Sequence, residues 1–340
     1  MRAALEAGCT AWNGGLFYGS IDGENSLTLL NRYFAKYPED AEKVVLNIKG
    51  CTSGAPSFLL DSSPEGVHKD VKLARSLLGD KGFIHQFEPA RKDPNVEIEV
   101  IVKAIDEHVK AGEIGGVALS EINAASIRRA SKVVKVSAVE IELSLWNTEP
   151  LENGIAQACA ELDIPIFAYC RLLSSLFSLL PSPFFPLPPL LSVAPTTVFS
   201  YLPLTLRTAP LGRGILTGQI KSLDDLPEGD HRRALPRFQP GAFETNLKLV
   251  DQVNKIASRK GCTPGQIAIN WLVSLSKRPG MPKIIPIPGT TSVARVAENS
   301  KIVELTDEDM ADIDKILKEC PLVGARLPEF AKRFEDKTTL

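Results

Sequence analysis

Short apolar runs alternate with charged, helix-length segments along most of this 340-residue chain. The segments between the runs, such as 97–111 and 155–162, have helical periodicity and are too long and too charged to be strands. Repeated strand and helix units favour parallel strands joined by right-handed crossovers. The sequence therefore predicts an α/β fold with seven strands, at 9–12, 44–48, 83–87, 115–119, 138–143, 165–169 and 283–287.

Length, charge and cysteine content narrow the class of protein. A chain of 340 residues can form one large barrel or two smaller domains. The formal net charge of −2 gives no electrostatic reason to expect a nucleic acid or an anionic membrane surface as partner. The six cysteines include no Cys-x-x-Cys pair, and the four histidines have no metal-ligand spacing. We expect a cytoplasmic protein with reduced thiols, no metal and a small-molecule partner.

Two motifs follow the first two apolar runs and carry the clearest chemical signal. They read WNGGLFYG over 12–19 and VVLNIKG over 44–50. An α/β barrel places its chemistry at the C-terminal ends of its strands. Lys49 beside Tyr18 would stabilise the phenolate, which lowers the cost of proton donation by the phenol. Either residue alone is more often a surface or packing residue, but together they predict an acid for carbonyl reduction.

The spacing of these motifs resembles that of the aldo-keto reductases, whose first motif reads Asp-Thr-Ala-x-x-Tyr-Gly and whose second ends in Lys. Asn13 falls on the Asp position, Tyr18 on the Tyr and Lys49 on the Lys. The variant Trp-Asn-Gly-Gly-x-Phe-Tyr-Gly is similar to the fungal pyridoxal reductase branch. The resemblance implies a (β/α)8 TIM barrel that reduces an aldehyde with NADPH, with Tyr18, Lys49 and Asn13 at the catalytic centre. Pyridoxal to pyridoxine, in vitamin B6 metabolism, is the reaction it favours.

Further residues match positions that bind the cofactor in this family. No Gly-x-Gly-x-x-Gly follows a strand, so a Rossmann site is disfavoured. Free N–H groups at a helix start and one guanidinium would suit a dianionic phosphate, which favours NADPH over NADH. The matches are Ser120 and Glu140 for the carboxamide, Tyr169 for the nicotinamide ring, Leu211, Gly212 and Gly214 for the pyrophosphate, and Thr290, Arg295, Glu298 and Asn299 for the adenosine phosphate.

The chain departs from the family pattern at the remaining catalytic positions. Ala90 stands where most members have a histidine, and His85 is too far along the strand to replace it, so we interpret His85 as structural. Asn13 removes the carboxylate that would pair with Lys49, so we expect a less anchored ammonium group. Glu88 has the same side-chain parity as Ala90, and we hypothesise that it supplies a counter-charge to Lys49.

We expect one barrel domain over 1–340, ending in a C-terminal helix and tail at 306–340. In the family, a hairpin, a first strand and most of a first helix precede the residues that open this chain. We therefore expect these elements to be lacking and the barrel to be open beside the strand that carries Asn13. A start codon assigned too far downstream is the simplest explanation.

The segment 171–208 is the second irregularity, because it has no acidic residue, no Lys and seven prolines. Each interior proline costs a helix about 3 kcal/mol, which argues against a membrane span. Joining 164–170 directly to 209–214 would restore the family motif. We interpret the segment as a retained intron in the gene sequence or, if it is translated, as an exposed, poorly ordered loop.

Two alternatives to an active reductase remain open. One is an NADPH-binding member with little turnover, like the potassium-channel β subunits that share this fold. The other is a defective gene product. The substrate aldehyde depends on variable loops, and the sequence leaves it and the oligomeric state open.

Overall fold

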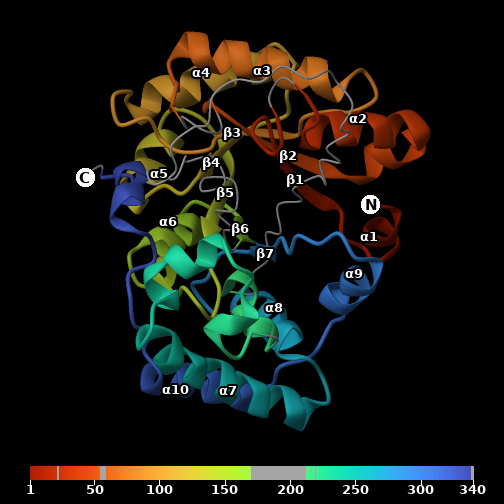
Figure 1. The fold of residues 1–340 in the computed structure, drawn as a ribbon. Helices are drawn as coiled ribbons and strands as arrows, with labels where there is room; N and C mark the ends of the chain where they lie inside the picture. Colours follow the sequence, from red (N-terminus) through yellow and green to blue (C-terminus); the bar gives the residue numbers. More distant parts are fainter. Residues whose placement is uncertain (21–22, 54–58, 170–211, 219, 338–340) are drawn as a thin grey trace, which may run out of the picture.

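A computed structural model describes residues 1–20, 23–53, 59–169, 212–218 and 220–337. Within them seven parallel strands form one sheet, in which each strand pairs with the next along the chain (Figure 1). The predicted insert 171–208 and the predicted ligand Leu211 lie outside the described residues. The strands are β1 (Ala11–Gly15), β2 (Val45–Gly50), β3 (Gln86–Pro89), β4 (Val117–Ser120), β5 (Val136–Glu142), β6 (Ile166–Tyr169) and β7 (Ile284–Pro286).

All seven predicted strands are present, but β1 and β3 begin and end later than the apolar runs indicated. β1 includes Gly14 and Gly15, which are poor strand formers. They are strand residues because they pair in register with Ile48 and Lys49 of β2. Pairing with a neighbouring strand, rather than local apolar content, therefore sets these boundaries.

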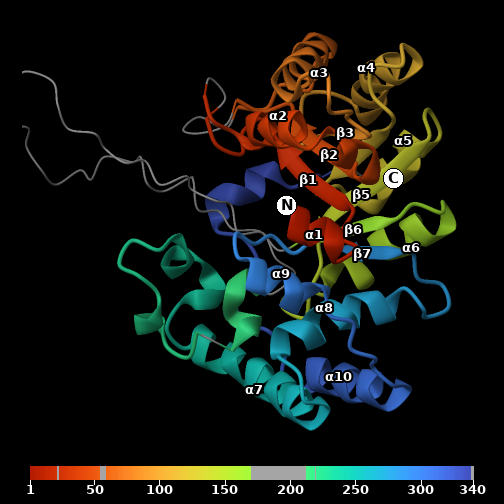
Figure 2. The same ribbon diagram turned by 90° about the vertical axis from the view of Figure 1, so that its right-hand side faces the viewer.

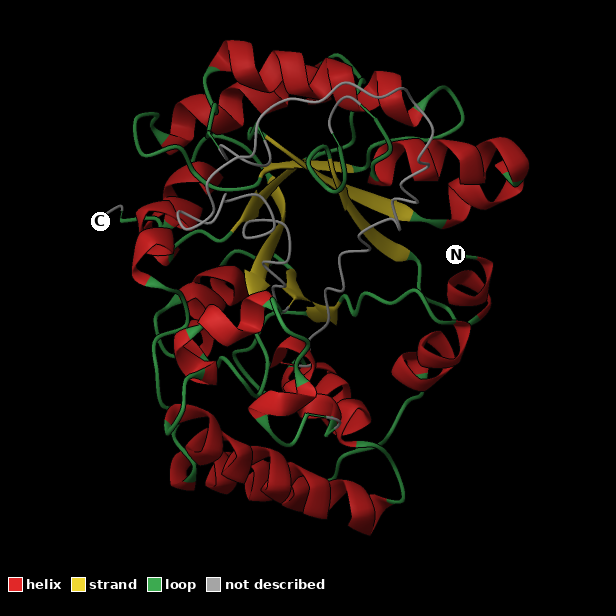
Figure 3. Ribbon diagram, in the orientation of Figure 1, coloured by secondary structure: helices red, strands yellow, loops and turns green. Residues whose placement is uncertain are grey.

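The helices alternate with the strands and pack outside the sheet (Figure 3). The side chains of Thr263, Ser292 and Thr306 cap the helices that follow them. No helix in the described ranges has both the length and the apolar content that crossing a bilayer requires. The helices are α1 (Arg2–Glu6), α2 (Ser26–Lys36), α3 (Pro64–Leu78), α4 (Ile98–Lys110), α5 (Ala124–Ser131), α6 (Ile155–Glu161), α7 (Ala242–Lys260), α8 (Pro264–Leu275), α9 (Val293–Ser300) and α10 (Asp307–Glu319).

The interior of the curled sheet has an apolar layer beneath a polar one. Ala118, Ala138 and Phe167 form a small buried cluster, and Ala11, Ile285 and Ile287 pack against it. Residues two apart on a strand face the same side of the sheet. The residue two positions after each cluster member therefore also faces the interior and lies closer to the C-terminal end of its strand. These residues are polar on four strands: Asn13, Ser120, Glu140 and Tyr169.

The described sheet has two end strands, β1 and β7, and no pairing joins them. α1 packs against α9, the helix that follows β7, so the two helices lie side by side next to this opening (Figure 2). The predicted architecture, an aldo-keto reductase type of barrel with seven strands and an opening beside the strand of Asn13, is confirmed for the described residues.

Candidate active site

The two sequence motifs meet at the C-terminal ends of β1 and β2. Gly15 and Lys49 are register partners on these neighbouring strands. A Cβ atom at Gly15 would lie 3.3 Å from Cβ of Lys49 and 3.4 Å from Cδ1 of Tyr18. Tyr18 and Lys49 therefore both pack against Gly15, and the lack of a side chain there leaves room for both. The structure therefore brings together the side chains of Tyr18 and Lys49, as the sequence predicted, and Tyr18 is among the groups that act electrostatically on Lys49.

Lys49 is held by two carboxylates. Its Nζ lies 2.6 Å from Oε1 of Glu88 on β3, and it also contacts Oε2 of Glu140, which reaches across the barrel interior from β5. The side chains of Lys49, Glu88 and Glu140 are only 4%, 0% and 3% exposed. The expectation of a less anchored Lys49 is wrong, because Glu140 arrives from a strand that is not adjacent and provides a carboxylate that Asn13 lacks.

These neighbours control the charge of Lys49. Burial alone would lower the pKa of Lys49, but Glu140, Glu88 and Tyr18 outweigh burial and raise this pKa above its ordinary value. Lys49 therefore stays charged at neutral pH. A charged ammonium beside a phenol favours the phenolate form, which is the condition for Tyr18 to give up a proton.

Two asparagines complete the surroundings of Glu140. The side-chain amides of Asn13 and Asn47 both donate to Oε2 of Glu140, and the Asn47 bond is 3.1 Å long. Asn13 is thus linked to Lys49 through Glu140. Sequence reasoning missed Asn47, although its position two residues before Lys49 puts it on the same face of β2.

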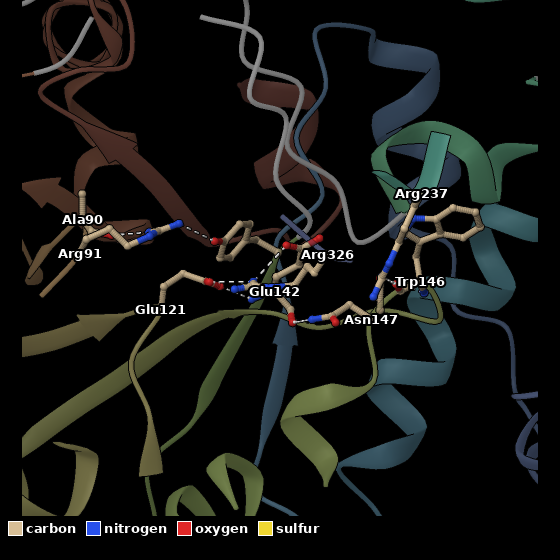
Figure 4. A network of polar contacts seen from close by, with 10 residues as sticks. Ala90, Arg91, Glu121, Glu142, Trp146, Asn147, Arg237 and Arg326 are labelled. Carbon is tan, nitrogen blue, oxygen red and sulfur yellow. Dashed lines mark hydrogen bonds and ion pairs between the residues drawn. The ribbon is translucent and has the colours of Figure 1, made fainter. Parts of the chain in front are cut away.

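Tyr169, the last residue of β6, forms a wall of the same site. Nζ of Lys49 lies 5.8 Å from the centre of its ring. Its hydroxyl accepts a hydrogen bond of 3.4 Å from Nη2 of Arg91, which follows β3 (Figure 4). Tyr169 is 4% exposed, so its ring is packed among its neighbours. Its stacking on a nicotinamide ring stays a prediction.

A second ion-pair cluster lies at the C-terminal ends of β4 and β5 (Figure 4). Nη1 of Arg326, from the segment after α10, lies 2.7 Å from Oε2 of Glu121 and 3.2 Å from Oε2 of Glu142. Burial would raise the pKa of Glu121, but Arg326 and Arg91 outweigh it and lower this pKa below its ordinary value. The C-terminal segment is thereby tied to the ends of β4 and β5. No local sequence pattern marked Arg326 for this role.

Ser120, predicted to bind the carboxamide of a cofactor, and Gly212 and Gly214, predicted to follow its pyrophosphate, have properties that suit these groups. Ser120 ends β4 and is 1% exposed, and its hydroxyl has no hydrogen-bond partner among the described residues. A buried polar group without a partner costs about 1–3 kcal/mol, so a carboxamide bound there would relieve the cost. Gly212 and Gly214 lie in the 3-10 helix Gly212–Thr217, and Gly214 has φ +91°, which favours glycine.

The residues predicted to hold the adenosine phosphate lie after β7, at the opposite end of the sheet from β1. The Thr290 hydroxyl accepts from the N–H of Ser292, and the Ser292 hydroxyl accepts from the N–H of Arg295. None of the α9 residues is buried, so the start of this helix is open to an anion. The Glu298 carboxylate accepts from the Thr263 hydroxyl at 2.8 Å, and Asn299 is half-buried on the same helix.

We expect Thr263→Ala to lower the free energy of unfolding by about 0.5–2 kcal/mol. The Thr263 hydroxyl caps α8 by accepting from the N–H of Gln266, and it also donates to Glu298 of α9. Urea unfolding measures the change. The matched control is Thr245→Ala, because that exposed hydroxyl bonds to the Gly241 carbonyl in the first turn of α7. An equal loss in both variants would contradict a specific role for Thr263.

A curled parallel sheet with a phenol and a buried ammonium at the C-terminal ends of its strands is the arrangement in which barrel enzymes place their catalytic groups. The chain matches the model of the Aldo/keto reductase family over residues 1–180 and 204–318 and belongs to that family. This confirms the resemblance found in the sequence. The family supports oxidoreductase activity on small molecules.

Relatives and solved structures agree with this assignment. The chain is 34% identical to "Probable pyridoxal reductase 2" of Schizosaccharomyces pombe over 334 residues, 96% of this chain and 86% of that protein. It is 32% identical over 335 residues to aldo-keto reductase yakc of the same organism, whose name includes NADP(+), with 96% and 83% covered. The glycerol dehydrogenase of Gluconobacter oxydans is similar in fold, with a TM-score of 0.69, 18% identity, and 100% and 87% covered.

Proposed function

We propose that this protein reduces an aldehyde to an alcohol with NADPH, and that pyridoxal is its substrate. The observation that carries the proposal is the buried, charged Lys49 beside Tyr18 at the mouth of the barrel. A relative named as a pyridoxal reductase supports the substrate, and a relative with NADP(+) in its name supports the cofactor. A cytoplasmic location, with reduced cysteines, belongs to the same proposal.

The side chains of the protein would supply the proton and stabilise the group that has donated it. Bound NADPH would supply the hydride. Tyr18 would donate its phenolic proton to the carbonyl oxygen of the aldehyde, and charged Lys49 would stabilise the phenolate that remains. Glu88 and Glu140 hold the ammonium group in position. The Asn13 amide orients Glu140, so its role in catalysis would be indirect.

Other residues would hold and orient the cofactor. The unpartnered Ser120 hydroxyl and the Tyr169 ring would fix the nicotinamide end, with Glu140 close to the carboxamide. The open start of α9 would hold the phosphate of the adenosine end. The remaining contacts would come from Leu211, Gly212 and Gly214 along the pyrophosphate and from Thr290, Arg295, Glu298 and Asn299 around the adenosine phosphate.

The proposal is tested by following NADPH oxidation with pyridoxal and a series of simple aldehydes. We expect turnover, with the highest kcat/KM for pyridoxal. A thermal shift on adding NADPH provides the control for binding, because a ligand at a hundredfold excess over its Kd stabilises the fold by about 2.7 kcal/mol. Binding without turnover of any aldehyde would favour a non-catalytic member of the family. No thermal shift would favour a defective product.

We expect Arg295→Ala to raise the Kd for NADPH by roughly ten- to a hundredfold, because hydrogen bonds to charged groups contribute about 1.5–3 kcal/mol. The Kd for NADH, which lacks the phosphate on the adenosine ribose, should be nearly the same in the wild type and in Arg295→Ala. Fluorescence titration with both dinucleotides measures the ratio. The control is Arg128→Ala, since Arg128 is an α5 arginine that pairs with Glu161 on the outside of the barrel. An equal loss for NADPH and NADH would contradict a phosphate contact by Arg295.

A further inference from the structure

The cluster around Lys49 contains two carboxylates but one cation. Lys49 is the only positively charged group in contact with Glu88 or Glu140 in the described part of the chain. If both carboxylates were ionised, the cluster would carry a net negative charge while almost completely buried. An unpaired buried charge is costly, and a carboxyl group in that situation commonly keeps its proton.

The hydrogen-bond donors divide unequally between the two carboxylates. Glu140 accepts from Asn13 and Asn47 and also contacts Lys49. Among the described residues, Glu88 pairs with Lys49 at 2.6 Å, but neither of its carboxyl oxygens accepts a hydrogen bond. A carboxylate with more donors is better stabilised in its charged form. This asymmetry favours charge on Glu140 and the proton on Glu88.

The electrostatics of Glu88 agree with this division. Burial raises the pKa of Glu88 well above its ordinary value, Glu140 raises it further, and Lys49 lowers it. Beyond Lys49 and Glu140, the nearest titratable groups are the phenols of Tyr18 and Tyr169, which act on Lys49, and Arg91 bonds to Tyr169 rather than to either carboxylate. Neither phenol can supply the positive charge that a second carboxylate would need.

We propose that Glu88 and Glu140 share one proton at neutral pH, which resides on Glu88, so that Glu140 is the counter-ion of Lys49 and Glu88 is a neutral positioning residue. This revises the hypothesis that Glu88 supplies the counter-charge. Loss of the proton at alkaline pH leaves two anions beside Lys49 and changes the cluster from neutral to negative. The added negative charge opposes formation of a phenolate at Tyr18, so reduction should slow as the proton is lost.

The first test needs no substrate. In cofactor-free protein labelled with ¹³C at the Glu side-chain carboxyl, NMR at pH 7 should give one resonance typical of a protonated carboxyl, and Glu88→Gln should remove it. Glu161→Gln, at an exposed glutamate that pairs with Arg128, is the control and should retain it. Absence of a protonated resonance in the wild type, or its survival in Glu88→Gln, overturns the proposal.

Stability gives a second readout independent of activity. A carboxyl whose pKa is raised by folding binds more protons in the native state, so stability falls as pH rises from the ordinary pKa through the folded pKa. The unfolding equilibrium constant should therefore increase with pH more steeply in the wild type than in Glu88→Gln, by up to roughly tenfold per pH unit. Parallel pH profiles for the two proteins would overturn the proposal.

The kinetic consequence rests on the proposed function. The alkaline decline of kcat for aldehyde reduction should begin at higher pH in Glu88→Gln, which keeps a neutral side chain at every pH, so that only ionisation of Tyr18 itself remains. Glu140→Gln removes the counter-ion of Lys49. At neutral pH the kcat of Glu140→Gln should therefore be lower than the kcat of Glu88→Gln by roughly tenfold or more. An unchanged alkaline decline in Glu88→Gln overturns this step. A wild type that reduces no aldehyde contradicts the proposed function, while the carboxyl proton remains measurable.

Discussion

Tyr18→Phe is expected to lower kcat for aldehyde reduction by roughly 10²–10⁴-fold, the usual contribution of a positioned acid. The substitution removes the phenolic hydroxyl and keeps the ring, which packs against Gly15 beside Lys49. Binding of NADPH should change little, because the hydroxyl is needed for the proton and not for the cofactor. Steady-state kinetics with saturating NADPH and fluorescence titration of the cofactor measure the two effects separately.

The matched control is Tyr37→Phe. Tyr37 directly follows α2 on the outside of the barrel, where its ring packs against Tyr33 and Arg2. We expect its kcat to equal that of the wild type. A reduction rate in Tyr18→Phe that matches the rate in Tyr37→Phe would show that another group provides the proton, and the proposed function would then lose its acid.

Lys49→Met is expected to lower the free energy of unfolding by about 3–5 kcal/mol, because removing one partner of a buried ion pair leaves uncompensated charge. Glu88 and Glu140 are almost completely buried and would lose their only cation in the described residues. Urea unfolding at pH 7 measures the loss. Lys49→Met protein that remains folded should also be a poor reductase, because the ammonium group that stabilises the Tyr18 phenolate is gone.

A double variant separates the loss of charge balance from the loss of packing. Lys49→Met combined with Glu140→Gln should regain part of the stability, because the second change removes the unpaired carboxylate. It should regain no activity. Lys110→Met is the control, since that side chain is 76% exposed and should affect stability by about 0.5 kcal/mol or less. Exactly additive losses in the double variant would contradict an interaction between Lys49 and Glu140.

Much of the site could be located from the sequence, because its residues follow strand-like runs. Tyr18, Lys49, Ser120 and Tyr169 all lie at or just beyond strand ends, where local pattern alone places them at the mouth of a parallel barrel. The cap of α8 at Thr263 is also visible in the sequence, because a helix cap depends only on residues a few positions away along the chain. The sequence did not show which distant residues contact these side chains.

The partner of Lys49 shows this limit. Sequence reasoning matched Glu140 to a carboxamide-binding position and expected Lys49 to be weakly held. In the structure Glu140 contacts Lys49, and it accepts hydrogen bonds from Asn47, which is 93 residues away in the sequence, and from Asn13, which is 127 residues away. Arg326 likewise reaches Glu121 over 205 residues.

The sequence by itself determined the alternation of strands and helices, the family, and the ends of the strands that carry the chemistry. These follow from local periodicity and from short motifs, which need no knowledge of distant residues. Only the tertiary structure decided that Glu140 meets Lys49 beside Glu88, whose contact with Lys49 the sequence had suggested, and that β1 extends through Gly14 and Gly15. Both depend on the register of paired strands and on the curl of the sheet, which brings side chains of β1, β2, β3 and β5 into one buried interior.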